Sequence, residues 1–178
     1  MTQGRTVNVP YDSIFGIYIR TEGVIRNGNR ILLSQAEGDD IWVLPGGSVK
    51  LFETTKEALE REFLEEIGLE IEVERLLWIV ENMFDFEASD LAPQFPPGKY
   101  HDIHFTYLVR PKEEGGDWLK EEFYGIEDDW APDMTLNLVF RWFAQDELDD
   151  INLVPVCMKE ILKKIPDHPS VIVNREEK

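Results

Sequence analysis

The sequence predicts a single α/β domain that spans residues 1–178. Its 178 residues, of which 43% are hydrophobic, are enough to bury a sizeable core in one domain. Segments with strand character stand on both sides of one long segment that has the apolar periodicity of a helix. The sequence contains no internal repeat and no low-complexity tract. A sheet that carries one main helix is therefore expected.

The residues before the main helix alternate between strand-like runs and turns. Strands are expected at residues 14–20, 23–26 and 30–34, with a break near Thr21-Glu22. Residues 1–12 are polar and are expected to form a tail or an edge strand. The Asn-Gly-Asn sequence at residues 27–29 is typical of a β-hairpin turn. An apolar run at residues 41–44 then leads to a Gly-Gly turn and into the helix.

The residues after the helix contain further strand-like runs and two long loops. Strands are expected at residues 71–81, 101–109 and 135–144. Residues 85–100, which include three prolines, and the acidic residues 112–135 are expected to be loop inserts. Pro155 is expected to begin a helix that continues to Lys164 and includes the single cysteine, Cys157.

Aromatic and histidine side chains near the first insert allow two interpretations. Phe86, Phe95 and Tyr100 are expected to anchor the insert on the core, and stacking on a base is the alternative. His101 and His104 are three residues apart on a strand, so they point to opposite faces and cannot share a metal ion. His104 is a candidate for contact with a substrate, and an ordinary hydrogen-bonded histidine is the alternative.

The main helix carries three carboxylates beside an apolar stripe. Each helical residue turns by about 100°, which places Glu62, Glu65 and Glu66 within one arc of roughly 100°. The adjoining arc is apolar and consists of Leu59, Phe63 and Ile67. Like charges one turn apart repel by a few tenths of a kcal/mol, so such a stripe either faces open water or binds a cation. Mg²⁺ prefers oxygen ligands of this kind.

The spacing of residues along this segment favours the cation site over a solvated acidic face. Gly47, five residues, Glu53, seven residues, and then Arg-Glu-Phe-Leu-Glu-Glu-Ile-Gly-Leu at residues 61–69 match the Nudix box, G-x5-E-x7-R-E-U-x-E-E-x-G-U, in which U is apolar. Every fixed position is filled without insertion or deletion, and Phe63 is apolar where an aliphatic residue is more usual. The chain thus resembles the Nudix hydrolase family.

This resemblance implies a fold and a set of roles. The family fold is an α/β/α sandwich around a mixed β-sheet. Divalent ions are expected to be held by Glu62, Glu65 and Glu66. The resemblance implies that the backbone carbonyl of Gly46 completes this metal shell, in which Glu62 and Glu66 are the closest ligands. It also implies that Arg61 and Glu53 orient these carboxylates. A glutamate would accept the proton from water, and the candidates are Glu65, Glu121 and Glu122.

The implied activity is Mg²⁺- or Mn²⁺-dependent hydrolysis of the diphosphate linkage in a nucleoside diphosphate joined to another moiety. A nucleotide sugar, ADP-ribose or a nucleoside triphosphate would fit, and the sequence does not choose among them. Residues expected to contact the substrate are Gly47, Arg30, His104 and Glu122. Because dimers are common in the family, a homodimer is also considered.

Charge and composition exclude other classes of partner. The formal charge is −18, from 36 acidic and 18 basic residues, which opposes binding to nucleic acid or to an anionic membrane. No basic region followed by an apolar run begins the chain, and no apolar run is long enough to span a bilayer, so a cytoplasmic protein is expected. With only one cysteine, no intramolecular disulfide is possible.

Three alternatives to this activity are considered. A non-catalytic nucleotide sensor would be expected to have a degenerate box, whereas this box is intact. An isoprenoid-diphosphate isomerase would be expected to carry a cysteine near the box, whereas Cys157 is far downstream. An RNA-decapping role lacks the basic and aromatic surface that RNA binding requires.

Overall fold

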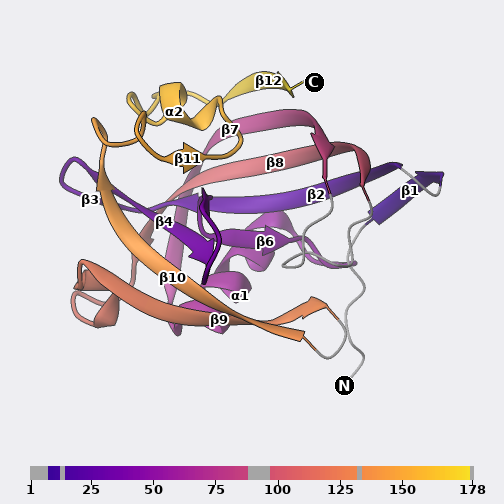
Figure 1. Cartoon of the computed structure of the whole chain (residues 1–178). Coiled ribbons are helices and arrows are strands. Elements are labelled where there is room, and N and C mark those ends of the chain that lie inside the picture. The colour runs from indigo at the N-terminus through magenta and orange to yellow at the C-terminus, as the bar shows by residue number, and fades with distance from the viewer. Residues whose placement is uncertain (1–7, 13–14, 88–96, 132–133, 177–178) are drawn as a thin grey trace.

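The computed structural model describes residues 8–12, 15–87, 97–131 and 134–176, which Figure 1 shows as ribbons. Its strands are β1 (Asn8–Asp12), β2 (Phe15–Val24), β3 (Arg26–Asn27), β4 (Arg30–Ala36), β5 (Ile41–Trp42), β6 (Gly46–Ser48), β7 (Ile71–Phe86), β8 (Gly98–Pro111), β9 (Glu122–Ala131), β10 (Met134–Ala144), β11 (Asn152–Leu153) and β12 (Ser170–Glu176). Its helices are α1 (Thr55–Ile67), the short α2 (Met158–Ile161) and the 3₁₀ turn η1 (Asp117–Leu119).

A mixed central sheet lies between the two α-helices. Its strand order is β1-β2-β8-β7-β12, and β6 also pairs with β2. The β2–β8 and β7–β12 pairs are parallel, whereas the β7–β8 and β2–β6 pairs are antiparallel. An antiparallel sheet of order β3-β4-β10-β9 adjoins it. Figure 1 shows α1 and α2 on opposite sides of the central sheet, which confirms the predicted single α/β/α domain.

Two hydrophobic clusters hold the helices on the sheets. On the α1 side, Leu59 and Phe63 pack among residues of both sheets, including Ile71 and Phe140, and all four are fully or almost fully buried. On the α2 side, Met158 belongs to a second cluster built on β4, β7 and the segment after β10. Each helix is therefore fixed against a sheet by apolar contacts, and α1 presents its acidic residues in a defined direction.

Helix α1 has clear signals at both ends. The Thr54 side chain accepts a hydrogen bond from the Glu57 amide, and Glu57 accepts one from the Thr54 amide, so that a capping box begins the helix. Gly68 ends it in the left-handed conformation, with φ of 66°, and its amide donates to the Leu64 carbonyl. These caps fix which residues form the buried face of the helix, including Glu62 and Glu66.

The prediction of a break near Thr21-Glu22 is wrong, because β2 runs unbroken from Phe15 to Val24. Both residues are buried and pair on both sides, with Gly47 and Gly46 of β6 and with β8. Polar residues in the middle of a central strand conceal its continuity in the sequence. The Asn-Gly-Asn turn is confirmed, since Gly28 has φ of 65° between β3 and β4.

The expected loop inserts are shorter than predicted. Strand β7 continues to Phe86 and β8 begins at Gly98, so the first insert loses residues at both ends, and Phe95 lies outside the described residues. The second insert is a loop only as far as Glu121, because β9 and β10 form a hairpin over much of the predicted segment. Acidic residues on the outward face of β9 conceal its strand character.

The C-terminal helix is also shorter than expected. Only Met158–Ile161 is α-helical, because most amides around it donate to the carbonyl three residues before, as Met158 does to Pro155 and Lys164 does to Ile161. Cys157 is half-buried and packs against the α2-side cluster, as expected for a small apolar residue. Among the described residues, no helix is long and apolar enough to cross a membrane.

Candidate active site

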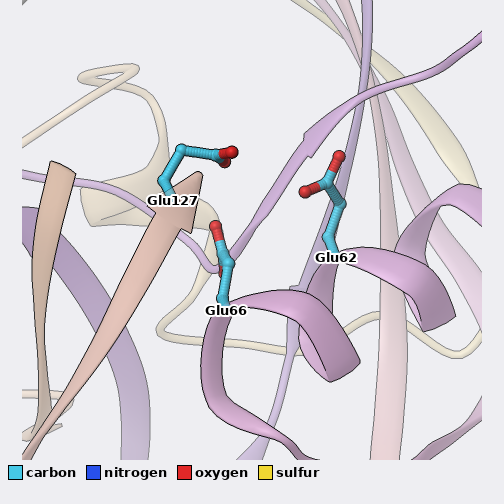
Figure 2. Close-up of side chains that lie close together, drawn as sticks. All are labelled: Glu62, Glu66 and Glu127. Carbon is cyan, nitrogen blue, oxygen red and sulfur yellow. The ribbon is translucent and has the colours of Figure 1, made fainter. Parts of the chain in front are cut away.

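Three carboxylates converge between α1 and β9. Glu62 and Glu66 come from the buried face of α1, and Glu127 comes from β9. Each residue places one carboxylate oxygen within 4.8 Å of the others. Figure 2 shows Glu127 extending from its strand toward the two helix carboxylates. The cluster is therefore built from two elements that are far apart in the sequence.

Two glycines make this convergence possible. A Cβ atom at Gly125 would lie 2.3 Å from the Glu66 carbonyl oxygen, so only glycine lets β9 approach the last turn of α1 this closely. Because side chains alternate along a strand, Glu127 lies on the same face as Gly125 and reaches the helix. A Cβ atom at Gly47 would lie 2.5 Å from the Glu62 carboxyl carbon, so Gly47 leaves room for that carboxylate.

The carboxylates of α1 are poorly solvated. Burial raises the pKa of Glu62 to about 7, although Arg61 acts in the opposite direction. Burial and the charges of Glu62 and Glu127 raise the pKa of Glu66 well above its ordinary value. Glu66 Oε2 is buried and has no hydrogen-bond partner in the described part of the chain. Such carboxylates remain ionised together only beside a cation, so this set of oxygens fits a hard divalent ion.

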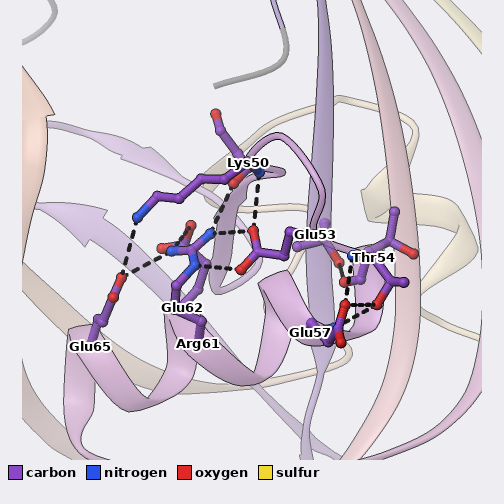
Figure 3. A network of polar contacts seen from close by, with 10 residues as sticks. Lys50, Glu53, Thr54, Glu57, Arg61, Glu62 and Glu65 are labelled. Carbon is purple, nitrogen blue, oxygen red and sulfur yellow. Dashed lines mark hydrogen bonds and ion pairs between the residues drawn. The ribbon is translucent and has the colours of Figure 1, made fainter. Parts of the chain in front are cut away.

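Arg61 holds one of these carboxylates in place (Figure 3). Its Nε and Nη2 atoms donate to the two oxygens of Glu53 at 2.7 and 3.0 Å, and Nη2 also donates to the Ser48 carbonyl at 3.1 Å. Its Nη1 atom lies 2.8 Å from Glu62 Oε1. Burial alone would raise the pKa of Glu53, but hydrogen bonds from Arg61 and the Lys50 amide outweigh it and lower the pKa. Glu53 thus anchors Arg61, and Arg61 orients Glu62.

Glu65, which the sequence analysis expects to be a metal ligand, does not join the cluster. Its side chain is 52% exposed and pairs with Arg61 Nη1 at 2.9 Å and with Lys50 at 3.9 Å. The structure replaces it with Glu127 as the third carboxylate. The only sequence signal for Glu127 is the expectation of a glutamate in the late acidic region, and the candidates named there, Glu121 and Glu122, do not belong to the cluster.

The other expected substrate contacts are dispersed. Arg30 pairs with Glu121 at 2.5 Å and lies over the Trp142 ring. Glu122 accepts a hydrogen bond from the Tyr124 hydroxyl. His104 lies in a separate buried cluster with Glu22. Of the expected substrate contacts, only Gly47 adjoins the three carboxylates.

Comparison with known proteins places this arrangement in a family. A family model described as the NUDIX domain matches residues 19–164. The chain belongs to the NUDIX domain family. A MutT-like protein from Streptomyces ambofaciens is 33% identical over 70 residues, which cover 39% of this chain and 42% of that relative. The match therefore spans less than half of the relative's length.

Solved structures share the fold of this Nudix domain. A mutator MutT protein from Bacillus halodurans is similar with a TM-score of 0.53 and 17% identity, over 89% of this chain and 90% of that chain. A NUDIX hydrolase from Nitrosomonas europaea is similar with a TM-score of 0.51 and 16% identity, over 92% of this chain and 81% of that chain. In the present Nudix domain, the box contributes two of the three clustered carboxylates, and Glu127 comes from outside it.

Without a bound cation, the stability of this Nudix domain is expected to fall as the pH rises from about 4.5 to about 7. In the folded state the pKa of Glu62 is raised from its ordinary value of 4.5 to about 7. Its stabilising contribution is therefore complete below the unfolded pKa and is lost as the pH rises through the folded pKa. Urea unfolding in chelator should show that the free energy of unfolding falls over this pH range by about 2 kcal/mol less in Glu62→Gln than in the wild type. Identical pH profiles for the two proteins would contradict the assignment.

Proposed function

We propose that this chain hydrolyses the diphosphate linkage of a nucleoside diphosphate joined to another moiety, in a reaction that depends on Mg²⁺ or Mn²⁺. The observation that carries this proposal is the convergence of Glu62, Glu66 and Glu127 within 4.8 Å, although burial and mutual repulsion disfavour their charges. A cluster of this kind is costly for stability and suits an ion that neutralises phosphate oxygens.

Glu62 and Glu66 would hold the ion, and the backbone carbonyl of Gly46 lies on the adjoining strand β6. When bound, the ion neutralises the diphosphate oxygens and lowers the pKa of water. Arg61 and Glu53 keep the Glu62 carboxylate in one orientation. Gly46 and Gly47, expected from the sequence to form a turn, lie on strand β6, where the absence of side chains lets Thr21 and the Glu62 carboxylate approach closely.

Glu127 is assigned as the proton acceptor for the attacking water. It faces the two helix carboxylates from β9, so a water between the two elements would lie within its reach. Glu65, the alternative considered from the sequence, is tied to Arg61 and Lys50. The carboxylate of Glu127 would therefore accept the proton while α1 orients the diphosphate.

The test is a turnover assay on a panel of nucleotide sugars, ADP-ribose and nucleoside triphosphates, with Mg²⁺, Mn²⁺ or chelator. We expect hydrolysis of one class of these compounds. Both the chelator and the Glu62→Gln substitution should abolish it. Glu60→Gln is the matched control, because Glu60 is exposed on the same helix. Nucleotide binding without turnover of any compound would overturn the proposed hydrolase activity and favour a non-catalytic nucleotide sensor.

Isomerase chemistry receives no support from the surroundings of the cysteine. Burial, together with the charges of Glu22 and Glu176, raises the pKa of the Cys157 thiol to about 11. The thiol is therefore neutral near pH 7 and a poor nucleophile. Cys157 also belongs to the α2-side cluster, whereas the clustered carboxylates lie on the α1 side of the central sheet.

Glu65→Gln is expected to reduce turnover by no more than about fivefold, because an exposed ion pair contributes up to about 1 kcal/mol. Glu65 is half-exposed and makes its contacts with Arg61 and Lys50 rather than with the cluster. Steady-state kinetics of Glu65→Gln beside Glu62→Gln would check this difference. A loss in Glu65→Gln as large as that in Glu62→Gln would return Glu65 to the catalytic set.

A further inference from the structure

An open cavity lies along β9, beside the clustered carboxylates. Its volume is about 470 Å³, and its walls include Glu66 in the last turn of α1 and Gly125 of β9. Glu66 also belongs to the carboxylate cluster, so one residue borders both places. β9 is the edge strand of its sheet and lies at the border of the molecule in Figure 1. A group attached to a diphosphate at the cluster would therefore have a solvent-accessible cavity as its neighbour.

The outward face of β9 and β10 forms the other wall of this cavity. Tyr124 and Ile126 are 65% and 44% exposed, and both line the cavity. Ile126 pairs with Asn137 of β10, which places their side chains on one face. Asn137 donates through Nδ2 to Glu37 Oε2 at 2.9 Å, so Glu37 continues this row from the end of β4. An aromatic ring and an aliphatic side chain thus stand beside a carboxylate and an amide, all open to solvent.

Hydrogen-bond acceptors outnumber donors in this cavity. Glu37 Oε1 and Asn137 Oδ1 accept no side-chain hydrogen bond from the described residues. The Tyr124 hydroxyl donates its proton to Glu122 at 3.2 Å, so this donor is already used. No lysine or arginine of the described chain lines the cavity. The cavity therefore favours a ligand that brings its own hydrogen-bond donors.

The surroundings of the cavity are also negative. Glu37 and Glu66 both line it. The hydrogen bond to Glu122 and the charge of Glu122 raise the pKa of Tyr124, and the charge of Glu37 adds to this effect. Two carboxylates therefore border the Tyr124 ring. They would repel a further phosphate or a carboxylate, whereas a neutral group would meet no such repulsion.

A sugar combines the properties that this cavity favours. Each hydroxyl is both a donor and an acceptor, so neighbouring hydroxyls would donate to Glu37 Oε1 and Asn137 Oδ1. The C–H face of a sugar ring is apolar and would lie on Tyr124 and Ile126. A nucleobase edge carries carbonyl and ring-nitrogen acceptors, which would face the carboxylate without a donor between them. A quaternary ammonium group is recognised by several aromatic rings, whereas Tyr124 is the only aromatic residue of the described chain that lines the cavity.

We propose that this cavity holds the sugar that is joined to a nucleoside diphosphate, with Glu37 and Asn137 accepting hydrogen bonds from its hydroxyls. This inference rests on the proposed function for the diphosphate, and it names the moiety on the other side of the linkage. Asn137 lies on β10 and Glu37 directly follows β4, so two paired strands hold the polar contacts. Tyr124 supplies the surface for the sugar ring.

The test observes Asn137 directly in the full chain, in chelator so that no hydrolysis occurs. Protein labelled with ¹⁵N is titrated with ADP-ribose, ADP-glucose, UDP-glucose and GDP-mannose and, separately, with ADP, UDP, GDP and CDP-choline. The Nδ2 signal of Asn137, assigned by its loss in Asn137→Asp, is expected to shift with at least one sugar nucleotide and to remain unchanged with ADP, UDP and GDP. No shift with any sugar nucleotide, an equal shift with a nucleoside diphosphate, or a shift with CDP-choline alone would overturn the proposal.

A variant provides an independent outcome. Glu37→Gln removes the charged acceptor, and it is expected to weaken binding of the preferred sugar nucleotide by at least about tenfold while leaving the affinity for the matching nucleoside diphosphate unchanged. Glu113→Gln, at an exposed position in the loop after β8 that does not line the cavity, is the matched control. Unchanged sugar-nucleotide affinity in folded Glu37→Gln would refute the role of the cavity. Because these measurements need no turnover, their failure is distinct from failure of the hydrolase assay.

Discussion

Glu66→Gln is expected to lower metal-dependent hydrolysis by about 10³-fold and, in chelator, to unfold at a higher urea concentration than the wild type. Glu66 is 6% exposed, and one of its oxygens lacks a hydrogen-bond partner in the described part of the chain. The substitution removes a ligand of the proposed ion. It also removes a buried carboxylate that Glu62 and Glu127 repel, so activity and metal-free stability should change in opposite directions.

The measurements are turnover with Mg²⁺ or Mn²⁺ and urea unfolding with and without the ion. The ion should stabilise the wild type and have little effect on Glu66→Gln, because binding only to the folded state increases the free energy of unfolding. Glu60→Gln should behave as the wild type in both assays. A variant that loses activity together with metal-free stability would indicate that Glu66 supports the fold and is not a ligand.

Gly125→Ala is expected to lower hydrolysis by about 100-fold although it changes no polar group. The added Cβ would lie 2.3 Å from the Glu66 carbonyl oxygen and 2.9 Å from the Ile67 side chain. Backbone cannot yield at that distance, so β9 must move away from α1. The Glu127 carboxylate would then move away from Glu62 and Glu66.

Gly115→Ala is the matched control, because an added Cβ there meets nothing within 4 Å. Circular dichroism and urea unfolding would establish that Gly125→Ala is folded before kinetics are compared. The loss should appear in kcat with little change in KM, because the proton acceptor is displaced while nucleotide contacts remain. Wild-type turnover in Gly125→Ala would refute the role assigned to the approach of β9.

Much of the site could be predicted because it is contained in one continuous segment. The apolar stripe predicts the helix that forms α1, and the spacing of the box then predicts the positions of Glu62 and Glu66. The Arg61–Glu53 pair, expected from the family, is present with bidentate geometry. Periodicity and spacing are sufficient when a helix alone determines the direction of its side chains.

The third carboxylate could not be predicted, because its position depends on a strand that the sequence conceals. Residues 122–131 contain several acids and no clean alternation of apolar residues, so the segment was predicted as a loop. In the structure, β9 aligns Phe123 with Phe140 at 5.3 Å, and this packing fixes the face that carries Glu127. Glu121 and Glu122 are glutamates of the same acidic region, and only the pairing of β9 in the folded protein distinguishes them from Glu127.

Glu65 shows the limit of the helical-angle argument. The angles correctly place it beside Glu62 on α1, but they do not show what stands opposite. Lys50 approaches from the turn before the helix and Arg61 from the preceding helical turn, so that Glu65 pairs with cations. Helix geometry predicts the direction of a side chain, whereas its partner depends on the rest of the fold.

The division of the carboxylates between α1 and β9 has a mechanical consequence. Glu62 and Glu66 belong to a helix packed against the central sheet, and Glu127 belongs to the edge strand of the other sheet. An ion held by Glu62 and Glu66 would attract the Glu127 carboxylate and so join the two sheets. Amide hydrogen exchange in β9 should then slow when the ion binds, whereas exchange in β7 and β8 should change little. The hairpin of β9 and β10 would therefore be rigid only in the ion-bound protein.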